Sequence, residues 1–240
     1  NIFANVVQER TPYMRVMAWN WSWSFYEEDP APSILAGLDQ SVTLLVGFER
    51  GGRKEILGKE RPIDEYSLGY AGPSERFLGT WEVARERGMS VAAKLQISTT
   101  HELATVANLP LVGSIYEKVR GMRSLDVHDF MGCWNFGNMP SVNTIALNGF
   151  LQVETLKPRD VELRELASAY LPGCDDGAVV AVWETLWNSM ENHPFCIPFL
   201  YFAPVNYALG HAVELGPLAY IDTGRSWMDD PRGDDLRPSF

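Results

Sequence analysis

The feature that most constrains the fold is a set of four short apolar runs, each of which breaks abruptly into polar or aromatic residues. The runs lie at residues 13–19, 42–48, 91–97 and 130–134. Strands that are buried on both faces are apolar throughout, and the loops that follow them carry the chemistry. Helix-bearing connections separate the runs, and crossovers of this length favour parallel pairing. The sequence therefore predicts four neighbouring parallel strands, in sequence order, in one sheet.

This pattern predicts an α/β protein with a parallel-stranded (β/α) barrel, or part of one. Residues 1–152 are expected to form the later βα units of a TIM-like barrel, and 153–240 a helical C-terminal extension with an irregular tail. Residues 53–73 read as a polar stretch without hairpin signals. Four parallel strands leave half a barrel open, so a further segment or chain is expected to complete it, or the sheet is an open one.

The net charge of −11 restricts the partners of the protein. A surface that binds nucleic-acid phosphates needs clustered Lys and Arg, so we expect no nucleic acid, and an anionic membrane surface is disfavoured as well. The three cysteines, Cys133, Cys174 and Cys196, have no metal-binding spacing. No P-loop, no GxGxxG after a strand and no clustered histidines occur, so no metal or organic cofactor is expected.

Glu49 is the first candidate for chemistry, because it directly follows the predicted strand at 42–48. A carboxylate at a strand end is rigidly placed, as general acid–base or nucleophilic work requires. The alternative is a solvent-facing side chain that pairs with Arg50 or Arg53.

His101 and Glu102 form the second candidate, in the polar loop after the strand at 91–97. The segment lacks the HExxH zinc pattern, because residue 105 is Thr. Glu102 is expected on the same rim as Glu49, with the two carboxyl groups within about 10 Å of each other. The alternative is a helix-capping loop in which Glu102 lies near a helix start.

Aromatic side chains also gather at predicted strand ends. Rigid aromatic rings suit the apolar faces of sugar rings, and asparagine side chains suit their hydroxyl groups. Core packing is the alternative for any single one of these rings. The candidates are Trp21, Trp23, Trp134 and Phe136, with Asn20, Asn135 and Asn138 beside them.

Together these strand ends resemble the second half of a (β/α)8-barrel glycoside hydrolase. The segments that carry the resemblance are Ala-Trp-Asn-Trp at 18–21, Phe-Glu-Arg at 48–50, Thr-Thr-His-Glu at 99–102 and Cys-Trp-Asn-Phe-Gly at 133–137. The helical stretch at 157–194, with Tyr-Phe-Ala-Pro-Val-Asn at 201–206, is similar to the extension behind the barrel in some bacterial members.

The resemblance implies hydrolysis of a glycosidic bond in an oligosaccharide or glycoside by paired carboxylates. Glu49 and Glu102 would be catalytic, and Trp21, Trp23, His101, Trp134 and Asn135 would bind the sugar. Two rivals stay open. One is a barrel that binds carbohydrate without turnover, and the other is a barrel hydrolase or lyase that acts on a non-sugar substrate through Lys94.

Overall fold

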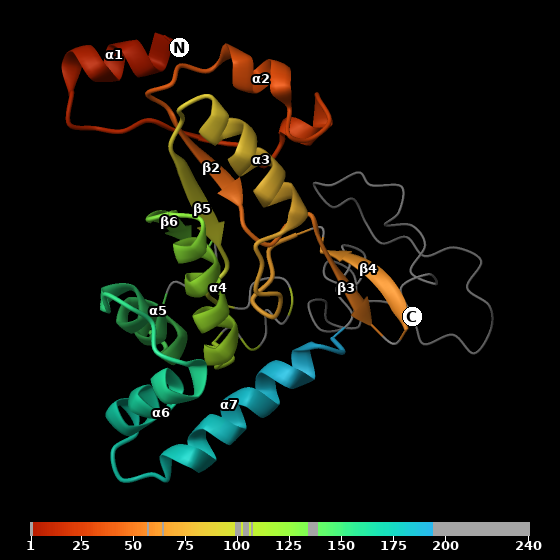
Figure 1. Ribbon diagram of the computed structural model, residues 1–240, viewed down its shortest axis with the longest axis vertical. Coiled ribbons are helices and arrows are strands. Elements are labelled where there is room, and N and C mark those ends of the chain that lie inside the picture. The colour runs from red at the N-terminus through yellow and green to blue at the C-terminus, as the bar shows by residue number, and fades with distance from the viewer. Residues whose placement is uncertain are drawn as a thin grey trace, which may run out of the picture.

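Four parallel strands form the central sheet of the computed structural model, which describes residues 2–56, 58–63, 65–98, 102, 106, 108–133 and 139–193. They are β1 (Met17–Trp19), β2 (Thr43–Gly47), β5 (Val91–Leu95) and β6 (Asp129–Gly132), in the order β1-β2-β5-β6 (Figure 1). All three pairings are parallel. The predictions of an α/β fold and of parallel neighbours in sequence order are confirmed. The described strands do not close into a barrel.

An antiparallel hairpin interrupts the βα pattern, and the expectation of no hairpin was wrong. Its strands are β3 (Gly52–Ile56) and β4 (Lys59–Ile63). Six of its ten residues are charged and four of these lie at exposed positions, while Ile56 and Ile63 are buried at the strand ends. A strand with so few buried positions lacks the apolar alternation by which sequence patterns reveal strands. Gly58 adopts φ +74° in the connection, where glycine carries no steric cost.

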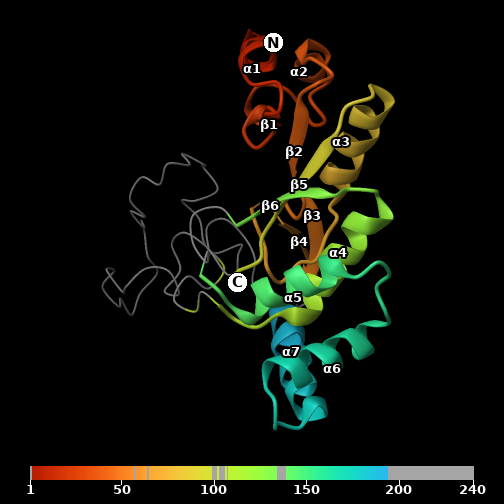
Figure 2. The ribbon, with the colours of Figure 1, turned by 90° about the vertical axis from the view of Figure 1, so that its left-hand side faces the viewer.

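The helices α3 (Glu75–Glu86) and α4 (Val112–Ser124) lie on the same side of the sheet (Figures 1 and 2). Alternate residues of β2 point to opposite faces, so Leu44 and Val46 enter the core with these helices. Ser74 caps α3, because its hydroxyl accepts a hydrogen bond from the Phe77 backbone at 3.1 Å. Phe77 in turn packs edge-to-face on Phe48, with 4.8 Å between the ring centroids.

Two short helices, α1 (Ile2–Arg10) and α2 (Pro32–Gly37), lie at one end of the molecule. The helices α5 (Val142–Gln152), α6 (Arg159–Tyr170) and α7 (Asp176–Met190) lie at the other (Figure 2). The sequence assigned no element to α5, whereas α6 and α7 lie in the stretch at 157–194 that the sequence indicated to be helical. No described helix is long and apolar enough to span a membrane.

The last two helices share the core of the sheet. Leu163 of α6 and Trp183 and Met190 of α7 belong to the same hydrophobic cluster as α4. Trp187 of α7 donates its indole N–H to the carbonyl of Gly69 at 3.0 Å, which ties α7 to the segment after the hairpin. A separate C-terminal region beginning at residue 153 stays a prediction, and its described helices pack directly on the first part of the chain.

Gly113→Ala tests the contact between α4 and α7. A Cβ at Gly113 would lie 2.5 Å from Cε3 of Trp187, so the helices must separate, and overpacking of this kind costs about 1–3 kcal/mol. Gly79→Ala is the matched control, because a Cβ there meets nothing within 4 Å and alanine suits a helix interior better by about 0.5–1 kcal/mol. Urea unfolding should show the first variant less stable and the second more stable. Equal stability of the two variants would contradict this packing.

Candidate active site at the strand ends

The carboxyl ends of β1, β2 and β5 meet at one rim of the sheet, as they do in all parallel sheets of this kind. Leu44 and Val46 of β2, and Phe48 directly after it, belong to the core that the helices share. Alternation then directs the intervening side chains to the opposite face. Lys94 is the register partner of Gly47 and therefore shares that face. The charged side chain of Lys94 therefore lies on the face of the sheet opposite the apolar face that packs on the helices.

Glu49 and Lys118 of α4 form an ion pair in which both side chains are fully buried. The ammonium group donates to Oε1 of Glu49 and to the carbonyls of Ser67 and Tyr70, at 2.8 and 3.0 Å for the carbonyls. The backbone N–H of Gln96 donates to the same Oε1 at 2.8 Å. Oε2 makes no hydrogen bond with any described residue. The alternative of a solvent-facing Glu49 is wrong, because one oxygen is fixed in the interior and the other is left open there.

Glu102 is buried as well, and its carboxylate binds a loop. Oε1 accepts from the Ser67 hydroxyl at 2.5 Å and from the Gly69 N–H at 3.3 Å, and Oε2 accepts from the Leu68 N–H at 2.6 Å. Burial raises the pKa of Glu102 above its ordinary value, and these three hydrogen bonds act in the opposite direction. All of its described donors come from residues 67–69, so Glu102 holds this loop against the rim.

Ser67 connects the two carboxylates. Its carbonyl accepts from Lys118, which binds Glu49, and its hydroxyl donates to Glu102. Glu49 and Glu102 thus belong to one buried polar network, as their positions after neighbouring strands predict. The expected separation of about 10 Å stays a prediction.

Lys94 is a second buried ammonium group at the rim, with a fully buried side chain. Its Nζ lies 4.2 Å from the centroid of the Tyr66 ring and donates to the carbonyl of Leu95 at 3.0 Å. Burial lowers the pKa of Lys94 to about 8, and the nearby charge of Glu49 opposes that shift. An amine with this pKa is partly unprotonated at neutral pH, which is the state of a base or a nucleophile.

An aromatic cluster adjoins Lys94. Trp19, at the end of β1, stacks on Tyr66 with 6.2 Å between ring centroids, and contacts Trp21 at 6.3 Å. The guanidinium of Arg50 lies 5.3 Å from the centroid of Trp21 and donates to its carbonyl at 2.5 Å. Trp23 instead packs against the hydrophobic core, as in the core-packing alternative.

Several predicted site residues lie outside the described part of the chain. For His101, Trp134, Asn135, Phe136 and Asn138, the assigned roles stay predictions. Among the described candidates, the structure brings Glu49, Glu102 and Trp21 to the rim.

Sequence reasoning missed four residues of the rim, namely Trp19, Glu65, Tyr66 and Lys118. Glu65 is 2 % exposed, and its charge acts on Lys94. It lies with Tyr66 in the stretch that was read only as polar. The feature of the sequence that could have indicated them is the aromatic residue Tyr66 next to the carboxylate of Glu65 within that polar stretch. Lys118 gave a weaker signal, a lone lysine among apolar residues of a predicted helix face.

Comparisons of this chain with protein-family models, curated proteins and solved structures found no match. Among the described residues, no three His, Cys, Asp or Glu side chains gather closely enough to hold a metal ion. The chemistry proposed for the rim therefore depends on its own geometry.

The pH dependence of stability tests the environment of Lys94. Between pH 8 and its ordinary pKa of 10.5, the unfolded chain binds more protons at this residue than the folded chain. The free energy of unfolding should therefore rise with pH through this window, by about 3 kcal/mol in total, and should not vary with pH because of Lys94 below it, where the buried charge destabilises the fold by a constant amount.

Lys94→Met should lack this rise, so its stability relative to the wild type should fall as pH increases from 8 to 10.5. Urea unfolding at several pH values measures the difference, and Lys59→Met, at an exposed position of β4, is the matched control for removing one ammonium group. Parallel pH curves for Lys94→Met and the wild type would show that Lys94 is not a strongly desolvated amine.

Proposed function

We propose that this protein is a carbohydrate-active hydrolase that cleaves a glycosidic bond at the strand-end rim. The observation that carries the proposal is the state of Glu49. Its Oε1 is fixed by Lys118 and the Gln96 backbone, while Oε2 is buried without a hydrogen bond from any described residue. Buried polar atoms are nearly always satisfied, so an open carboxylate oxygen at a strand end supports a role toward a substrate.

The surroundings of Glu49 support the same function. Trp19 and Tyr66 provide rigid stacked rings beside Lys94, whose pKa responds to the charge of Glu49. Aromatic faces bind the apolar faces of sugar rings. Trp21 extends this aromatic surface along the rim.

Glycoside hydrolysis generally requires a second carboxyl group, and the chain offers two candidates. Glu102 accepts three hydrogen bonds from the loop at residues 67–69, one from a hydroxyl and two from backbone N–H groups, which favours a positioning role. Glu65 is buried and close enough to act electrostatically on Lys94, the amine that Glu49 also influences. We therefore assign Glu49 and Glu65 to the reaction, and Glu102 to the placement of residues 67–69.

Substitutions at the three carboxylates test this assignment. Glu49→Gln and Glu65→Gln should each lower kcat by about 10²–10⁴-fold, the range expected for loss of acid–base catalysis. Glu102→Gln should raise KM or lower stability more than it lowers kcat, because it acts through the loop. The assay is release of 4-methylumbelliferone or reducing ends from a panel of glycosides and polysaccharides.

Glu82→Gln, on the exposed side of α3, is the control, and circular dichroism checks that each variant is folded. Wild-type turnover in Glu49→Gln would remove Glu49 from the catalytic assignment. A loss in Glu102→Gln as large as in Glu49→Gln, in kcat alone, would restore the pair Glu49 and Glu102. Sugar binding by the wild type without turnover would identify a non-catalytic carbohydrate-binding protein.

A second candidate function follows from Lys94 alone. An amine whose burial lowers its pKa to about 8 is suited to attack a carbonyl carbon, forming an imine with loss of water. Sodium borohydride would reduce that imine to a stable secondary amine. Trapping of a carbonyl substrate such as pyruvate or a keto sugar on Lys94, detected by peptide mass spectrometry and absent in Lys94→Met, would select a lyase over a glycosidase.

A further inference from the structure

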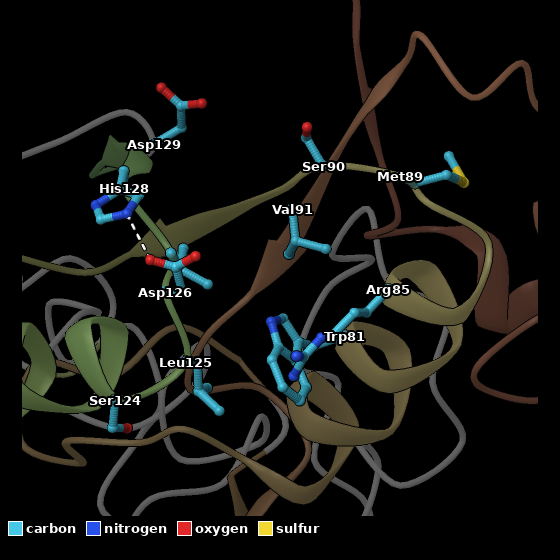
Figure 3. Close-up of a pocket in the computed structure, with 11 residues that line it drawn as sticks. Trp81, Arg85, Met89, Ser90, Val91, Ser124, Leu125, Asp126, His128 and Asp129 are labelled. Carbon is cyan, nitrogen blue, oxygen red and sulfur yellow. Dashed lines mark hydrogen bonds and ion pairs between the residues drawn. The ribbon is translucent and has the colours of Figure 1, made fainter.

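A cavity lies at the opposite end of the sheet from the rim. Its volume is about 480 Å³, and it is lined by the start of β5, the residues that lead into β6 and the C-terminal parts of α3 and α4 (Figure 3). This volume falls in the range of small-molecule sites, about 300–1,000 Å³. The rim residues Glu49, Lys94 and Glu102 do not line it, so the cavity is distinct from the candidate active site.

One side of the cavity presents an aromatic ring and a cation. Trp81 of α3 packs partly against the hydrophobic core, and the Cζ of Arg85, one turn later, lies 5.2 Å from the centroid of its ring. Arg85 makes no hydrogen bond or ion pair with any described residue. Its N–H groups are therefore held near the indole while they remain available to a ligand.

The other side presents acceptors and donors at short range. His128 Nε2 lies 2.8 Å from Oδ1 of Asp126, and both side chains are largely exposed. Asp126 adopts φ +56°, an uncommon left-handed conformation for a residue other than glycine, at the turn that brings it to the cavity. Figure 3 shows this pair facing the side of the cavity that carries Trp81. Ser90 adds a hydroxyl group at the start of β5.

We propose that this cavity binds a neutral carbohydrate. A cationic ligand would meet Arg85, and an anionic ligand would meet Asp126, whereas the carboxylate of Asp129 is already paired with Arg15. A neutral ring with hydroxyl groups can instead donate to Asp126 and to Nδ1 of His128, whose Nε2 is bound to Asp126, accept from Arg85, and place its apolar face against Trp81 and Leu125. This site does not require hydrolysis at the rim, and it would hold a sugar far from the reacting bond.

NMR titration of the full chain with maltoheptaose, cellohexaose and chitohexaose tests the site. At least one probe should shift the indole N–H resonance of Trp81, assigned by its loss in Trp81→Ala, in a saturable manner. Arg85→Ala, an exposed position that should not affect folding, should weaken binding on the order of tenfold, the equivalent of about 1.4 kcal/mol. Glu82→Gln, on the same helix and outside the cavity lining, should bind as the wild type does.

The absence of a Trp81 shift at the solubility limit of all three probes would overturn the proposal. Equal affinity in the wild type and Arg85→Ala would also overturn it, as would saturation by inorganic phosphate alone, which would indicate an anion site. If only the proposed hydrolase function is wrong, glycoside turnover will be absent while the probes still shift the Trp81 resonance in a saturable manner.

Discussion

The buried ion pair between Glu49 and Lys118 is the interaction on which the rim depends. Removing two charges from water costs several kcal/mol for each ion, and only good geometry with additional hydrogen bonds offsets that cost. Lys118 meets this requirement with three acceptors, the carboxylate of Glu49 and the carbonyls of Ser67 and Tyr70. The pair therefore joins the end of β2, helix α4 and the loop after the hairpin, and a change to one partner would leave the other charge buried and unpaired.

The same network explains why the loop at residues 67–69 lies against the strand ends. Glu102 binds this loop through two backbone N–H groups and a hydroxyl, and Trp187 binds the carbonyl of Gly69 from α7. The position of the loop is thus fixed from two sides by buried polar contacts rather than by apolar packing alone. Tyr66, which directly precedes this loop, lies over the ammonium group of Lys94.

The sequence predicted the parts of the fold that depend on local pattern. The strands β2 and β5 are apolar runs that were visible in the chain, and Gly88, which adopts φ +71°, follows the end of α3. The hairpin was missed because its side chains are mostly charged. The partner of Glu49 could not be predicted, because Lys118 lies 69 residues away and nothing in the local pattern joins them.

Oε2 of Glu49 accepts no hydrogen bond from any residue that the structure describes, and in the proposed function this atom links stability to activity. A buried acceptor without a hydrogen bond is destabilising by about 1–3 kcal/mol, and folded proteins rarely retain one without a use. The carboxylate of Glu102 accepts three hydrogen bonds, which use both of its oxygens. The carboxylate of Glu49 accepts two, and both are on Oε1. The two carboxylates therefore differ in how many of their oxygens are hydrogen-bonded. In the proposed function Glu102 is therefore part of the scaffold, whereas Oε2 of Glu49 is the hydrogen-bonding position for a bound substrate.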